Sequence, residues 1–169
     1  MWRLSHRADP QAAAVADRHY SRQKPGSPQF VPPGRCMVLF LETMQGNAYW
    51  VTSWPFAQYV KHAWAGAWLC SAFRNESHVL SSCLVRDAVA ATRAFYGEPP
   101  TLGMVTFVDR SKVRRKRDFG RCFRKAGFRE CGETKGGLLA LQLLPGEMPE
   151  PAMPFGMQSR LTEVMSGQE

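Results

Sequence analysis

Two short stretches of the chain carry residue types that are suited to acid–base chemistry. The first is the pair His19 and Tyr20, and the second is Asp109, which follows an apolar run. Histidine titrates near neutral pH, so His19 is a candidate general base, a role worth about 10²- to 10⁴-fold in rate when well placed. Tyr20 can offer an aromatic face to a planar ligand, and the Asp109 carboxylate can accept hydrogen bonds from an amine. We predict that these three residues are catalytic.

The same residues also have purely structural interpretations. A histidine near the C-terminal end of a helix interacts favourably with the helix dipole, which would explain His19. An aspartate directly after a strand commonly begins a loop and accepts hydrogen bonds from its own turn, which would explain Asp109. The residues alone leave both interpretations open.

A second polar group follows another apolar stretch. Arg74 and Asn75 come directly after residues 67–73, and Ser81 and Ser82 precede a helical pattern. Arginine donors can stabilise an oxyanion or bind a charged co-substrate, and free amides at a helix N-terminus attract anions. We predict that these four residues bind the donor substrate. The alternatives are that Arg74 pairs with Glu76 and that the serines only cap the helix.

The most basic part of the chain directly follows Asp109. Nine lysines or arginines lie between Arg110 and Lys125, against the single acidic residue Asp118. The net charge of +8 over 169 residues favours an anionic partner such as DNA, whose binding would weaken with salt. A charge run is also commonly just a solvated surface. The predicted phosphate-binding residues are Arg22, Lys24, Arg110, Lys112, Arg114, Arg115, Lys116, Arg117 and Arg121.

The elements that must position these residues follow from the hydrophobic pattern. Apolar and β-branched runs predict strands at residues 2–7, 36–42, 48–53, 67–73, 104–108, 129–133 and 137–144. Asp9 and Pro10 are typical of a helix start, so a helix is expected through residue 23. A second helix runs from Ser81 or Ser82 to Gly97, and a third covers residues 120–126. The sequence therefore predicts an α/β protein with a mixed, mostly antiparallel sheet flanked by helices.

Composition limits the domain organisation and the class of protein. A chain of 169 residues is expected to form a single domain, which we place at residues 1–144. Prolines crowd the start of residues 145–169, so this part is predicted to be a flexible tail. Five cysteines without a CxxC spacing argue against a disulfide framework or a zinc knuckle. The charged N-terminus and the lack of a long apolar run predict neither an export signal nor a membrane span, and hence a cytoplasmic protein.

The predicted order of elements resembles the GNAT acyltransferase fold. The stretch that contains Phe123, Lys125, Gly127 and Phe128 is similar to the closing helix of that family, which precedes the last hairpin. The resemblance implies that a substrate amine meets an acyl donor between two diverging strands. The glycine-rich loop that holds acetyl-CoA in the family has no counterpart in residues 74–83, which weighs against acetyl-CoA as the donor.

A narrower resemblance is to the Mom family of phage DNA-modification proteins. It rests on residues 19–22 (HYSR) with the prolines that follow, on FRNE and LSS in residues 73–82, and on residues 107–109 (FVD) before the basic loop. The resemblance implies an enzyme that places a methylcarbamoyl-type group on the N6 amine of adenine in DNA and so protects DNA from restriction. The residues that it implicates are His19, Tyr20, Asp109, Arg74, and Ser81 or Ser82.

The same resemblance implies iron, with His19, Tyr20 and Asp109 as possible ligands. An iron site with two histidines would take its second from His6, His62 or His78. It also implies an aromatic residue after the aspartate, at Phe119 or Phe123.

Two other functions remain open at this level. One is an acyl-CoA-dependent N-acetyltransferase that acts on a small amine or a protein. The other is a nucleic-acid-binding module without catalytic activity. The sequence leaves the oligomeric state open, a dimer included.

Overall fold

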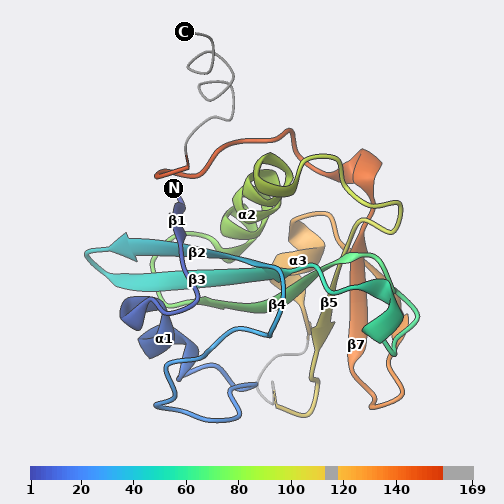
Figure 1. Ribbon diagram of the computed structural model, residues 1–169, viewed down its shortest axis with the longest axis horizontal. Coiled ribbons are helices and arrows are strands. Elements are labelled where there is room, and N and C mark those ends of the chain that lie inside the picture. Colours follow the sequence, from blue (N-terminus) through green and yellow to red (C-terminus); the bar gives the residue numbers. More distant parts are fainter. Residues whose placement is uncertain (113–117, 158–169) are drawn as a thin grey trace, which may run out of the picture.

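The computed structural model describes residues 1–112 and 118–157, which form one seven-stranded mixed sheet with helices on both faces (Figure 1). The order of the strands across the sheet is β1-β2-β3-β4-β5-β7-β6. The strands are β1 (Arg3–Ser5), β2 (Cys36–Thr43), β3 (Gly46–Ser53), β4 (Trp68–Asn75), β5 (Met104–Val108), β6 (Arg129–Glu133) and β7 (Leu139–Leu143). The helices are α1 (Pro10–Ala16), α2 (Ser81–Tyr96) and α3 (Arg121–Lys125), with short 3-10 turns η1 (Ala57–Tyr59) and η2 (Pro145–Glu147).

This arrangement confirms the α/β class and the predicted order of helices and strands. The strands β2 and β3 form the expected antiparallel hairpin, with Thr43 opposite Gly46 at its turn. In the described part of the chain, no helix is both long enough and apolar enough to cross a membrane.

The core lies on both faces of the sheet because successive side chains of a strand point to opposite sides. In β2, Met37, Leu39 and Leu41 belong to the larger apolar cluster, which includes the inner side of α2. The alternate residues Val38 and Phe40 belong to a second cluster with α1. The apolar run in β2 is therefore continuous because both of its faces are buried.

The strands β4 and β5 form the parallel pair of the sheet, and they are paired only at their beginnings. The register joins Trp68 to Met104, Leu69 to Val105 and Cys70 to Thr106. Beyond these pairs β4 stays with β3, where Arg74 lies opposite Tyr49, while β5 stays paired with β7 along its whole length. Figure 1 shows β2 and β3 running in a different direction from β5 and β7. The sheet therefore opens between the C-terminal halves of β4 and β5.

The first helix is shorter than predicted, and this changes the setting of His19 and Tyr20. Asp9 caps α1 by accepting hydrogen bonds from the amides of Gln11 and Ala12, as the sequence indicates. The helix ends at Ala16, however, and not at residue 23. The cause is Asp17, whose carboxylate binds Arg22 at 2.7 Å and the amide of Gly26 at 2.9 Å, which turns the chain into a loop.

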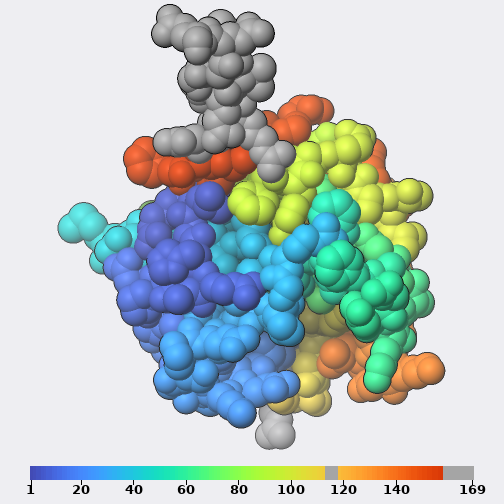
Figure 2. All heavy atoms as spheres, in the orientation of Figure 1, coloured from blue at the N-terminus to red at the C-terminus, as the bar shows by residue number. Residues whose placement is uncertain are grey.

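The proline-rich segment after β7 makes more contacts with the domain than expected of a tail. The amide of Phe155 donates to the carbonyl of Trp2, and the amide of Leu4 donates to Phe155. Further along α2, the Arg93 side chain donates to Pro149 and the Ala152 amide donates to Ala90. Figure 2 shows this orange-red segment lying across the N-terminal residues and α2. Residues 158–169, the rest of the predicted tail, lie outside the described residues.

Candidate active site

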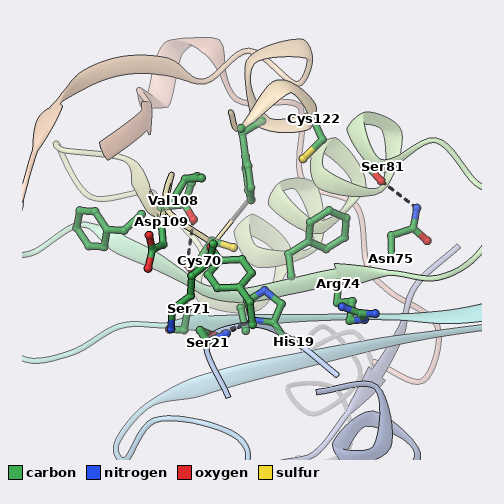
Figure 3. A pocket seen from close by; sticks show the side chains of 18 of the residues that line it. His19, Ser21, Cys70, Ser71, Arg74, Asn75, Ser81, Val108, Asp109 and Cys122 are labelled. Atoms are coloured by element: carbon green, nitrogen blue, oxygen red, sulfur yellow. Dashed lines mark hydrogen bonds between the residues drawn. The ribbon is translucent and has the colours of Figure 1, made fainter. Parts of the chain in front are cut away.

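A cavity of about 1460 Å³ opens where β4 and β5 part. Its walls come from the loop after α1, the second half of β4, the start of α2, the end of β5, and α3. The predicted catalytic and donor-binding residues all line it, namely His19, Tyr20, Asp109, Arg74, Asn75, Ser81 and Ser82. Figure 3 shows His19, Arg74 and Asp109 around this space, although they come from three separate parts of the chain.

The loop that carries His19 is held to the end of β4 by a network of ion pairs. Arg18 binds the Glu76 carboxylate through two nitrogens, at 2.8 and 2.6 Å. Arg74 binds the same carboxylate at 2.6 Å and also donates to the backbone carbonyl of Arg18 at 2.6 Å. The hydrogen bond from Arg18 is the main reason why the pKa of Glu76 falls to about 2. The predicted alternative for Arg74, a pair with Glu76, is therefore observed, and it leaves Arg74 on the cavity wall.

His19 is partly buried, and its Nδ1 nitrogen bonds to Ser21. Its Nδ1 atom lies 2.7 Å from Oγ of Ser21 and accepts from the Ser21 amide at 3.2 Å. The ring also interacts with the backbone of Phe73 and stacks on Tyr20 at 4.5 Å between centroids. Burial, and then the nearby positive charge of Arg74, lower the pKa of His19 to about 4. The imidazole is therefore neutral at pH 7 and can accept a proton.

The Tyr20 side chain contacts the backbone of Asp109 across the cavity. The Tyr20 hydroxyl interacts with the backbone of Asp109, while burial raises the pKa of the phenol. The Asp109 carboxylate accepts from the amide of Ser111 at 2.9 Å and from its hydroxyl at 2.6 Å. The hydrogen bond from the Ser111 side chain is the largest cause of the lowered pKa of Asp109. Asp109 thus caps its own turn, the structural role that its place after a strand allows, and its charge still faces the cavity.

Asn75, Ser81 and Ser82 connect β4 to α2, but the serines do not cap the helix as predicted. The N-cap is Leu80, which makes no side-chain capping bond, and Ser81 is the first helical residue. The Asn75 side chain donates to the carbonyl of Val79 at 2.7 Å and to Oγ of Ser81 at 3.0 Å. This side chain therefore closes the loop and presents the start of α2 to the cavity (Figure 3).

The predicted phosphate-binding residues other than Arg22 fall into three groups. Lys112 and Arg121 are exposed and line the cavity, and Lys24 is exposed elsewhere. Arg110 pairs with Glu133. Arg114, Arg115, Lys116 and Arg117 lie outside the described residues.

Arg22 has a different role from the one predicted. Besides Asp17, it binds the backbone carbonyls of Gln29 at 2.7 Å and Ser27 at 2.5 Å. Its side chain is only 10% exposed, so it organises the loop and does not face a polymer.

The predicted iron ligands do not fit an iron centre in this arrangement. Nδ1 of His19 already bonds to Ser21, and the Asp109 carboxylate is bound to its own turn. Within residues 1–112 and 118–157, no group of three or more His, Cys, Asp or Glu side chains is placed to hold a metal ion. Of the two predicted aromatic positions, Phe123 is buried in the core and also lines the cavity, whereas Phe119 is partly buried against the core.

Sequence reasoning missed several residues of the cavity wall. Ser21 belongs to the same HYSR stretch as His19, and its position two residues away was the available signal. Arg18 and Lys125 add positive charge to the wall. Cys70 also lines the cavity, but its burial raises the pKa of the thiol far above its usual value, which makes it a poor nucleophile.

Comparison of the chain with models of known protein families, with curated proteins and with solved structures finds no match. The function must therefore be inferred from the cavity itself.

Proposed function

We propose that this protein is a DNA-modifying acyltransferase that attaches a methylcarbamoyl-like group to the N6 amine of adenine and so protects DNA from restriction. The observation that carries the proposal is that one cavity combines a neutral histidine with a rim of exposed cations, Lys112, Arg121 and Lys125. The resemblance to the GNAT and Mom families, which the sequence suggested, is consistent with the parting of β4 and β5.

The size of the cavity supports a reaction between two bound molecules. A single small-molecule site usually occupies about 300–1,000 Å³, and this cavity is larger, at about 1460 Å³. Adenine in a duplex can reach such a site only if it leaves the stack, which costs a few kcal/mol that contacts in the pocket must offset. Tyr20, which is 40% exposed and stacked on His19, offers an aromatic face for the extruded base.

The chemistry requires a proton acceptor. The lone pair of the N6 amine is delocalised into the ring, so the amine becomes strongly acidic only once it has bonded to the acyl carbon. A base with a pKa of about 4 is then sufficient, and His19 is such a base and is unprotonated at pH 7. The positive charge of Arg74 lies on the same wall and would stabilise the oxyanion that forms on the acyl group.

The cationic rim supports a polymeric substrate. Lysine and arginine contacts to phosphates position a nucleic acid without reading its sequence. In this proposal the rim and the basic residues 110–117 hold the DNA backbone while one base enters the cavity. The protein would then act where DNA is accessible, in the cytoplasm of a bacterial host.

The decisive experiment is mass spectrometry of nucleosides from DNA of cells that express the chain. A new deoxyadenosine adduct in the wild type is the expected result, and its absence from well-expressed protein would contradict the proposal. Asp109→Asn and His19→Gln are the matched variants. The asparagine keeps an oxygen for the Ser111 turn but removes the charge, so the fold and the DNA affinity should be retained while the adduct is reduced or lost.

A second candidate is an acyl-CoA-dependent N-acyltransferase for another amine. The start of α2 faces the same opening through Ser81 and Ser82, and such helix ends favour anionic groups. Isothermal titration separates the two functions, because this candidate predicts acetyl-CoA binding without affinity for duplex DNA. A binding module without catalysis would instead keep its biological effect in His19→Gln and Asp109→Asn.

A further inference from the structure

The hydrogen bonds of His19 identify which nitrogen carries the proton. The amide of Ser21 can only donate, and it points at Nδ1 from 3.2 Å, so Nδ1 must hold a lone pair. The proton of the neutral ring is therefore on Nε2. The ring also interacts with the backbone of Phe73.

The basic nitrogen of His19 is consequently covered by Ser21. The hydroxyl oxygen of Ser21 lies 2.7 Å from Nδ1, which is a normal distance for a hydroxyl that donates to an imidazole. Both residues line the cavity, and Ser21 is the more exposed of the two. Figure 3 shows the two side chains joined in this way at the cavity wall. A substrate amine in the cavity can reach the hydroxyl directly.

We propose that Ser21 is a catalytic residue that relays the proton of the substrate amine to His19. This inference rests on the proposed acyl transfer and takes the acyl donor to be a thioester, whose leaving group is a thiol. As the amine nitrogen bonds to the acyl carbon, its N–H bond breaks and the proton goes to Oγ of Ser21. The original hydroxyl proton of Ser21 moves to Nδ1 of His19. When the carbon–sulfur bond breaks, the electron pair leaves with sulfur, and the proton returns from His19 through Ser21 to form the free thiol.

The surroundings of the pair favour a relay over direct contact with the ring. One face of the imidazole stacks on Tyr20, and the ring edge meets Tyr49 at 6.4 Å between centroids. The ring also interacts with the backbone of Phe73, and burial together with the positive charge of Arg74 lowers the pKa of His19, which keeps the ring neutral. The route to the basic nitrogen therefore passes through the Ser21 hydroxyl. If Ser21 only closed its own turn, it would not have to contact the substrate.

The test uses the full-length protein with duplex DNA and measures the rate of adduct formation together with DNA affinity. Ser21→Ala should lower the rate by roughly 10²-fold, within the range for loss of proton-transfer catalysis, while the affinity for DNA stays unchanged. Ser21→Thr keeps the hydroxyl and should retain most of the rate. Ser27→Ala is the control, because Ser27 lies in the same loop but not among the described residues that line the cavity.

A measurement on the free protein is independent of activity. Nitrogen-15 spectra of histidine should show His19 as the neutral Nε2–H tautomer at pH 7, and Ser21→Ala should shift the Nδ1 signal. Finding the proton on Nδ1 would overturn the relay whatever the activity. An active wild type with an equally active Ser21→Ala would overturn the relay and leave the proposed function standing. A wild type that never forms an adduct, in spite of the expected tautomer, would instead refute the proposed function and the relay with it.

Discussion

Arg18 and Glu76 are joined by a two-point ion pair, with nitrogen–oxygen distances of 2.8 and 2.6 Å. The pair connects the loop after α1 to the end of β4, two segments that are far apart in the chain. Arg74 binds the same carboxylate and the Arg18 carbonyl, so three residues form one closed unit. His19 directly follows Arg18, and the unit therefore sets where the candidate base stands in the cavity.

Removing the charge of Glu76 should weaken this unit. We expect Glu76→Gln to lower the free energy of unfolding by about 1 kcal/mol, the upper end for partly exposed ion pairs, and to reduce adduct formation through displacement of His19. Urea denaturation at pH 7 measures the first effect. Glu42→Gln is the control, since Glu42 is exposed and takes part in no ion pair among the described residues. Equal losses in the two variants would show that Glu76 has no special role.

The lowered pKa of His19 predicts a dependence of stability on pH. The unfolded chain binds a proton at a pKa near 6.5, whereas the folded protein does so only near 4. Between these pH values the unfolded state binds more protons than the folded state. The contribution of His19 to the free energy of unfolding should therefore be fully present above pH 6.5 and should decrease as the pH falls towards 4. At about 1.4 kcal/mol per pKa unit, the upper limit of this loss is about 3.5 kcal/mol.

Urea midpoints measured from pH 4 to 7 test this dependence. His19→Gln should flatten the curve in that window. Burial also lowers the pKa of His62, so a smaller slope should remain until His62→Gln is added, apart from the slope below about pH 5 that comes from the lowered pKa of Glu76. If the His19 variant keeps the full slope, the neutral, buried state assigned to this imidazole is wrong.

Gly103 at the start of β5 should tolerate no side chain. Its φ is +64°, and a Cβ there would lie 2.0 Å from the carbonyl oxygen of Leu143 in β7. Gly103→Ala should cost about 3 kcal/mol or more, because backbone strain and a clash with backbone add together. Gly137 has a similar φ of +79° but open space around it, so Gly137→Ala should cost only about 1–2 kcal/mol. Thermal unfolding of both variants measures the difference, and equal losses would rule out the clash.

The cationic rim predicts a specific change in salt dependence. Replacing Lys112 and Arg121 together by glutamine should weaken binding to all duplexes alike. It should also reduce the slope of log affinity against log salt by about 0.9 for each phosphate that is no longer neutralised. Lys135→Gln is the control, because Lys135 is exposed in the β6–β7 turn and outside the described cavity wall. An unchanged slope in the double variant would remove these residues from the DNA interface.

Much of the fold was predictable because local rules decide it. The continuous apolar run of β2, the Asp9 cap of α1 and the spacing of Leu84, Ala88 and Ala91 in α2 all depend on neighbours in the chain. Prediction failed where a distant or side-chain contact decides the local structure. The end of α1 at Ala16 depends on the bonds of Asp17 to Arg22 and Gly26, which helix propensity does not include.

The sequence by itself determined which residue types are available for chemistry, that Asp109 follows one strand and that Arg74 lies near the end of another. Only the tertiary structure decided that they share one cavity with His19, since this depends on where β4 and β5 cease to pair. It also decided that Ser21 covers the basic nitrogen of His19 and that Arg22 supports a loop. The bonds of Ser21 and Arg22 lie within the loop after α1, and their directions exist only once that loop has folded.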